Sequence, residues 1–201
     1  MKKILTLVLA SSLAGFAAAC ATSENTNTAT NTAANTTAPN TTAPKTAARD
    51  DVPPSVHAAF PDAQSITKDH KDLTAAQIAA IEKETGSKVP DTDHHSYLAF
   101  STSGGARKQI GAASEVAVNG KHLVVVYESR AGKPYIKELR AEGVAQPFLD
   151  QFKGKGHDEK FQIGGDLKAE GVDGATAKAI AAAVHVDIMT MQTLYGAADV
   201  H

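Results

Sequence analysis

The chain has 201 residues, with 20 Lys or Arg and 22 Asp or Glu, and its formal net charge is −2. This near balance gives no support to nucleic acid, or to a strongly charged surface, as a partner. The single cysteine, Cys20, excludes an internal disulfide, a zinc site made of several thiolates and an iron–sulfur cluster. The length suffices for one ordinary domain.

Residues 1–20 have the pattern of a bacterial lipoprotein signal peptide. Lys2 and Lys3 form a positive n-region, and the apolar run over residues 4–13 is too short for a stable membrane span. Small residues precede Cys20, which favours lipidation of this cysteine over a free thiol after ordinary cleavage or a buried structural cysteine. The resemblance to a lipobox implies an extracytoplasmic protein held on the membrane by a lipid anchor. In a two-membrane bacterium it implies the periplasm-facing outer membrane.

Residues 21–50 are predicted to be a disordered tether. They consist mostly of Thr, Asn and Ala, with Pro39 and Pro44 interspersed. A segment with so few large apolar groups cannot bury enough surface to offset its ordering entropy. We therefore expect a single folded domain over residues 51–201.

The first part of this domain predicts two helices and an edge strand. Residues 52–60 predict a short helix that ends before Pro61, and residues 64–70 an edge strand. Thr74 and Gln77 form a capping box, which predicts a helix running to about Thr85.

The middle of the domain predicts a sheet. Strands are expected at residues 96–102, 109–118, 123–127 and 135–140, and Asn119-Gly120 is a strong hairpin signal. Short turns between consecutive strands indicate antiparallel pairing. A short helix is expected at 144–152 and a long one at the end of the chain. The predicted class is α+β, an antiparallel sheet with the helices grouped on one side.

The segment Asp91-Thr92-Asp93-His94-His95 has the most metal-like composition in the chain. Its spacing matches no recognised zinc geometry, so we interpret it as a solvated loop before a strand, with a metal site as the less favoured alternative. No metal ligand and no catalytic residue are predicted. His185, on the last helix, is expected at the surface or half-buried.

The last helix is predicted to begin in the turn Val172-Asp173-Gly174-Ala175-Thr176. Asp173 can cap the helix, and Gly174 leaves the backbone bare. The Thr176 hydroxyl would lie beside unsatisfied amides and the positive end of the helix dipole, where phosphate groups bind. The alternative is a purely structural cap. Apolar residues at helical spacing predict a buried stripe after the turn: Ala177, Ala181, Val184, Ile188, Met191 and Tyr195.

A wider set of motifs surrounds this turn. They are Phe60-Pro61-Asp62-Ala63, Leu73-Thr74-Ala75-Ala76-Gln77, Ile110-Gly111-Ala112-Ala113, Gln151-Phe152-Lys153-Gly154-Lys155, Val172-Asp173-Gly174-Ala175-Thr176 and Ala181-Ala182-Ala183-Val184. Together they resemble the FMN-binding domain of the flavoprotein subunits of Rnf and Nqr electron-transport complexes and of related single-domain proteins. The resemblance spans roughly residues 55–196, and its specific part is Gly-Ala-Thr.

The family motif has the form Asp-x-x-Ser-Gly-Ala-Thr, and a flavin transferase uses FAD to attach FMN phosphate to its threonine. The resemblance implies Thr176 as the acceptor, with Asp173, Gly174 and Ala175 beside the cofactor. Glu170 stands where the family has Asp, and Asp173 where it has Ser. Covalent and non-covalent binding of FMN both stay open.

The function that this resemblance implies is electron transfer by a lipid-anchored FMN protein, more an electron carrier than a stand-alone enzyme. The implied partners are a flavin transferase and unidentified redox donor and acceptor proteins. The alternative is a lipoprotein binding module, or an inhibitor-like module, with the same fold and no flavin.

Overall fold

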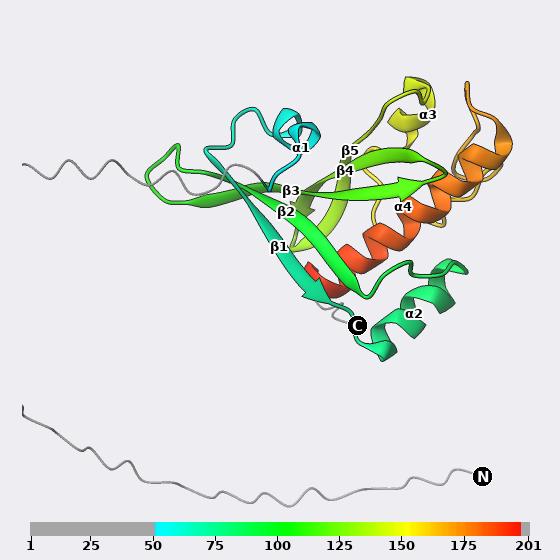
Figure 1. The fold of residues 1–201 in the computed structure, drawn as a ribbon, viewed down its shortest axis with the longest axis horizontal. Helices are drawn as coiled ribbons and strands as arrows, with labels where there is room; N and C mark the ends of the chain where they lie inside the picture. Colours follow the sequence, from blue (N-terminus) through cyan, green and yellow to red (C-terminus); the bar gives the residue numbers. More distant parts are fainter. Residues whose placement is uncertain (1–50, 198–201) are drawn as a thin grey trace, which may run out of the picture. The chain divides into compact units, whose positions relative to one another are not determined.

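Five antiparallel strands form one sheet in the computed structural model, which describes residues 51–197 (Figure 1). Their order in space follows their order in the chain, β1-β2-β3-β4-β5. With four α-helices they confirm the predicted α+β class. The predicted signal peptide, Cys20 and the tether lie outside the described residues. The strands are β1 (Ser65–Asp72), β2 (Asp93–Ser101), β3 (Lys108–Val118), β4 (Lys121–Arg130) and β5 (Lys133–Ala141).

Tight turns connect the last three strands. Asn119 and Gly120 have φ values of 50° and 72° between β3 and β4, and Ala131 and Gly132 have 51° and 81° between β4 and β5. Two successive residues with positive φ make the turn whose twist matches that of a hairpin. The Asn-Gly hairpin predicted from the sequence is therefore confirmed.

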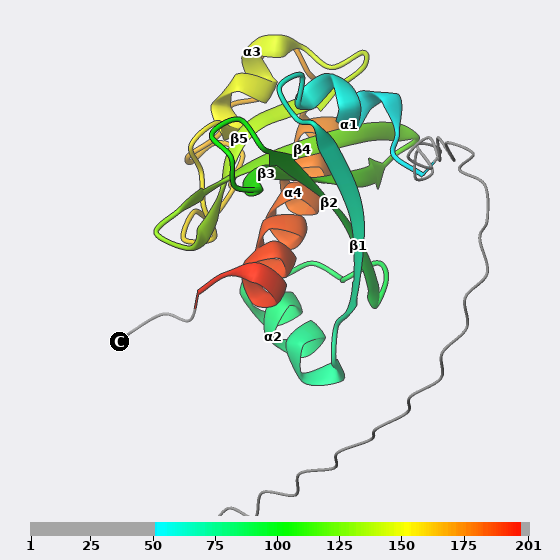
Figure 2. The same cartoon turned by 90° about the vertical axis from the view of Figure 1, so that its left-hand side faces the viewer.

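Helices cover both faces of the sheet (Figure 2). The long helix α4 (Gly174–Tyr195) packs on the face that carries Leu123 and Val125 of β4. The short helix α1 (Pro54–Ala59) packs on the face that carries Val124 and Val126. Because alternate residues of β4 face two different cores, its central run is apolar throughout. The expected grouping of helices on one side holds for the later helices, and α1 is the exception.

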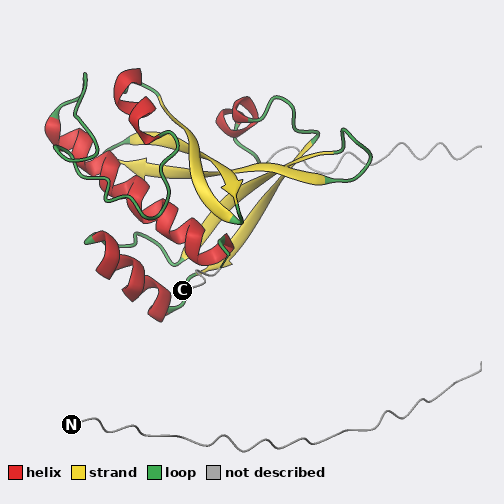
Figure 3. Ribbon diagram, turned by 180° about the vertical axis from the view of Figure 1, so that it is seen from behind, coloured by secondary structure: helices red, strands yellow, loops and turns green. Residues whose placement is uncertain are grey.

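Helix α2 (Ala75–Thr85) lies beside α4 (Figure 3). Its capping box is formed as predicted: the Thr74 amide donates to Gln77 Oε1 at 2.9 Å, and the Gln77 amide donates to Thr74 Oγ1 at 3.3 Å. The helix ends at Gly86, whose φ is 66°. Ile81 packs with Val186 of α4 in a small apolar cluster, so α2 is fixed mainly against α4.

After β5 the chain forms α3 (Gln146–Leu149), then one turn of 3-10 helix (Asp150–Phe152) and an irregular stretch that leads to α4. The stretch is tied to β5, since the Gly154 amide donates to the Ile136 carbonyl at 2.7 Å. Among the described helices, none combines the length and the apolar character that a membrane span requires.

Two predictions about histidines are wrong. Strand β2 begins at Asp93, so His94 and His95 belong to the strand and not to a loop, because these residues pair with the end of β1. His185 is only 5 % exposed, because its ring stacks on Phe161 with the centroids 5.0 Å apart.

Candidate functional site

The predicted phosphate-binding turn stands at the N-terminus of α4. Asp173 is the N-cap, and its Oδ1 accepts hydrogen bonds from the amides of Ala175 and Thr176 at 3.1 and 2.9 Å. A hydrogen bond from the Thr176 side chain is the largest influence that lowers the pKa of Asp173, followed by these amides. The carboxylate therefore already uses donors that a free phosphate would need.

The turn is open to solvent. Asp173, Gly174 and Ala175 are exposed and Thr176 is half-buried. A Cβ placed on Gly174 would meet no atom within 4 Å. The structure thus brings the four predicted residues together at an accessible helix end, outside four cavities that later residues of α4 line.

A small hollow of about 340 Å³ lies further along α4. Lys178, Ala182 and His185 form its helical side, so it begins two residues after Thr176, about 3 Å along the helix axis. Phe161, which stacks on His185, lines the hollow from the segment that precedes α4. Burial is the main cause that lowers the pKa of His185. Both rings are nearly fully buried, so they contribute little accessible surface to the hollow.

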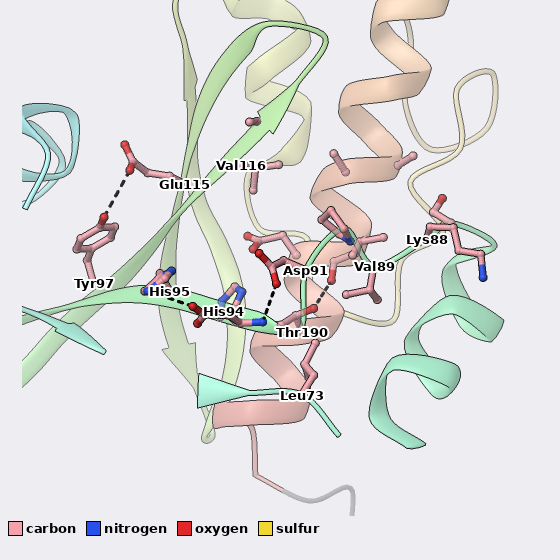
Figure 4. Close-up of a pocket in the computed structure, with 18 of the residues that line it drawn as sticks. Leu73, Lys88, Val89, Asp91, His94, His95, Tyr97, Glu115, Val116 and Thr190 are labelled. Carbon is pink, nitrogen blue, oxygen red and sulfur yellow. Dashed lines mark hydrogen bonds and ion pairs between the residues drawn. The ribbon is translucent and has the colours of Figure 1, made fainter. Parts of the chain in front are cut away.

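A larger cavity of about 660 Å³ lies where two strands diverge (Figure 4). β2 pairs with β1 from Asp93 onward but with β3 only from Ser96 onward. Between the separated strand ends, the cavity reaches α4 at Ala182 and Ala183. These small side chains do not fill the space between β3 and the unpaired start of β2.

A buried carboxyl group lies against this cavity. Tyr127 of β4 donates its hydroxyl hydrogen to Asp187 Oδ2 at 2.5 Å, and Ser114 of β3 donates to the same oxygen. Burial raises the pKa of Asp187, an effect that the charge of His94 and the two hydrogen bonds oppose. Sequence reasoning missed this group. The available signal was an Asp on the helix face that also carries Val184 and Met191.

Further polar side chains line the cavity, and they come from both faces of β2. Tyr97 donates to Glu115 Oε2 at 3.4 Å, as Figure 4 shows. His94 points to the opposite face, where its Nε2 lies 3.3 Å from the Met191 sulfur, while His95 shares the face of Tyr97. The cavity therefore combines small and apolar residues of α4 with several titratable side chains.

Comparison of the chain with models of protein families, with curated proteins and with solved structures found no match.

Proposed function

We propose that this protein is an extracytoplasmic, lipid-anchored electron carrier that holds FMN at the N-terminus of α4. The observation that supports this proposal is the position of Thr176, which is half-buried in the first turn of a 22-residue helix and directly follows the exposed residues Asp173, Gly174 and Ala175. The motif resemblance supplies the identity of the cofactor. FMN supplies the transfer of one or two electrons when bound.

Covalent attachment suits this helix end better than free phosphate binding. Asp173 occupies the Ala175 and Thr176 amides and adds a negative charge that repels a free phosphate. A phosphoester on Thr176 does not depend on those amides. In the proposed step, the Thr176 oxygen attacks the FMN phosphorus of FAD, the bond to AMP breaks, AMP leaves and the hydroxyl proton is released. The flavin transferase is the partner that carries out this step.

The 340 Å³ hollow is the proposed place for the flavin ring. It starts two residues after Thr176, and its volume lies at the lower end of the range for ligand pockets. Lys160 and Lys178 line it together with Phe161. A flat aromatic ring that becomes more electron-rich on reduction would meet two cations there.

Flavin fluorescence on denaturing gels tests the attachment site, after co-expression with a flavin transferase. Wild type and Thr176→Ser should fluoresce because both carry the hydroxyl. Thr176→Val should not, since valine keeps the shape and removes the nucleophile. Asp173→Ser should increase the labelled fraction. Thr193→Val changes an exposed threonine near the other end of α4 and should stay labelled. Unlabelled wild type would exclude covalent attachment, and labelled Thr176→Val would place it elsewhere.

The alternative is a lipoprotein binding module, or an inhibitor-like module, with the same fold and no flavin. The observation that favours it is the 660 Å³ cavity, which has a more suitable ligand-binding volume than the hollow and does not include Thr176. Flavin content separates the two proposals. Purified protein without any flavin absorbance, from a host that has the transferase, would favour the binding module.

A further inference from the structure

His70, Asp93 and His95 lie together on one face of the sheet, where β1 ends and β2 begins. His70 is directly opposite His95 in the strand register, and Asp93 is opposite Asp72. One nitrogen or carboxylate oxygen from each of the three side chains lies within 4.8 Å of the other two. We propose that these three side chains bind a divalent transition-metal ion, with Zn²⁺ as the representative.

The distances between the polar atoms suit such an ion. His70 Nδ1 lies 3.3 Å from Asp93 Oδ1, and His95 Nε2 lies 3.5 Å from Asp93 Oδ2. Tetrahedral zinc with bonds of about 2.0–2.1 Å places neighbouring ligand atoms about 3.3–3.4 Å apart. The two imidazole rings stand edge to face, at 89°, with centroids 5.2 Å apart. Small side-chain rotations would direct both nitrogens and one carboxylate oxygen at a common point.

One carboxylate oxygen of the cluster is unsatisfied. Asp93 Oδ1 is buried and accepts no hydrogen bond from the described residues. Its neighbour His70 Nδ1 is close but lacks hydrogen-bond geometry. Buried carboxylate oxygens are ordinarily paired, so this one needs an explanation. A cation between the three side chains would satisfy it.

The ligand types and the exposure define the class of metal. Two imidazole nitrogens favour ions such as Zn²⁺ over Mg²⁺ and Ca²⁺, which prefer oxygen. The His70 and His95 side chains are 56 % and 41 % exposed, so solvent can supply a fourth ligand. Three protein ligands with one open position are typical of reactive rather than purely structural zinc sites.

Charged side chains next to the cluster influence its affinity for a metal ion. Asp72 Oδ1 lies 3.7 Å from Nε2 of His70, where it can orient the ring through the nitrogen that does not face Asp93. Asp91 accepts a hydrogen bond from the Asp93 amide at 3.1 Å and lines the cavity next to it. Lys68 lines the same cavity and opposes a bound cation, and the two carboxylates offset it. Metal binding by this cluster is independent of flavin attachment.

Calorimetric titration with Zn²⁺ tests the proposal on the mature chain, without a histidine tag and after chelator treatment. Wild type should bind one Zn²⁺ per chain. His95→Asn and Asp93→Asn should each weaken the affinity by at least about tenfold, because even indirect partners of metal ligands have effects of that size. Co²⁺ should give the visible absorption of a low-coordinate site, and these variants should lose it.

Two histidine variants are matched controls. His94→Asn changes the residue between two proposed ligands, on the opposite face of β2, and His122→Asn changes an exposed histidine of β4. Both should bind Zn²⁺ like wild type. Should a β2 variant fail to fold, His70→Asn on the exposed edge strand still tests the site. The proposal is wrong if wild type shows no saturable binding of Zn²⁺, or if the ligand variants bind as well as the controls.

Discussion

Tyr127 donates a 2.5 Å hydrogen bond to Asp187, although the two residues lie 60 positions apart in the chain. The bond joins the middle of the sheet to the middle of α4 inside the main core, which is the core between α4 and the sheet. Ser114 donates to the same carboxylate oxygen, so two strands contact the helix through one acceptor. Burial raises the pKa values of both Tyr127 and Asp187. Such a buried polar group fixes the position of α4 relative to the sheet, because a shift of the helix would leave the carboxyl group unpaired.

Tyr127→Phe should destabilise the protein by about 1–3 kcal/mol, because the buried Asp187 loses one of its two donors while the packing changes little. Urea unfolding measures the free-energy difference. Tyr135→Phe is the control, since that tyrosine is half-buried and its ring lies under Arg130 instead of on a buried carboxyl group. Equal stability of Tyr127→Phe and wild type would show that the bond contributes nothing.

Asp187→Asn should change the pH dependence of stability. The folded state raises the pKa of Asp187 above its ordinary 3.8, so the folded protein holds this proton more tightly than the unfolded chain does. The contribution of the protonated Asp187 is complete below the unfolded-state pKa and is lost as pH rises toward the folded-state pKa. Asparagine does not titrate.

The stability of Asp187→Asn relative to wild type should therefore rise through this window and then level off. Urea unfolding at several values from about pH 4 to about pH 7 measures the difference. His94, Ser114 and Tyr127 face the carboxyl group, so these residues stay unchanged in both proteins. A difference that is constant with pH would contradict the prediction.

Gly111→Ala should destabilise the protein by about 1–3 kcal/mol through overpacking. A Cβ at Gly111 would lie 2.6 Å from Cε1 of the buried Phe60 and 3.2 Å from the Tyr127 carbonyl oxygen. Thermal unfolding measures the effect. Gly174→Ala is the matched control, because a Cβ there meets nothing within 4 Å, and it should unfold at the wild-type temperature or slightly above. A wild-type midpoint for Gly111→Ala would mean that Phe60 moves at no cost.

Thr74→Ala should lower the free energy of unfolding by about 1 kcal/mol, because the first turn of α2 loses its side-chain acceptor. Lys83→Ala, at an exposed position later in the same helix, is the control and should have little effect. Hydrogen exchange of the Gln77 amide, which donates to Thr74 Oγ1, gives a local readout. Unchanged exchange at Gln77 would count against the role of the cap.

Cys20 lies outside the described residues, and its lipidation is tested by detergent partitioning. Wild type expressed with its signal peptide should enter the detergent phase, and Cys20→Ser should remain in the aqueous phase, because only the cysteine provides a thiol for acylation. Both proteins in the aqueous phase would exclude the lipid anchor.

Local chemistry explains which features could be predicted from the sequence. The capping box at Thr74, the Asn119-Gly120 turn and the N-cap at Asp173 each depend on a few adjacent residues, and all three are found. The buried stripe of α4 follows from helical spacing, and five of its six predicted members are in the main core while Tyr195 packs on it half-buried.

Contacts between distant segments could not be predicted in this way. The bond between Asp187 and Tyr127 depends on how α4 lies across β4. The cluster of His70 with Asp93 and His95 depends on the register of β1 and β2. The segment Asp91 to His95 contains two of these three side chains but lacks the third, and its composition alone predicts a loop.

The succession β1-β2-β3-β4-β5 also constrains the order in which the domain can be built as it emerges from the ribosome or a translocation channel. Each strand can pair with the one before it as soon as it emerges. The connections from β2 to β5 are short, although α2 lies between β1 and β2, so sheet formation should be fast. The face with Leu123 and Val125, however, can be covered only after α4, the last helix of the described chain, has been synthesised. Until that helix docks, the nascent sheet presents an uncovered apolar surface, so we expect this late intermediate to be prone to aggregation.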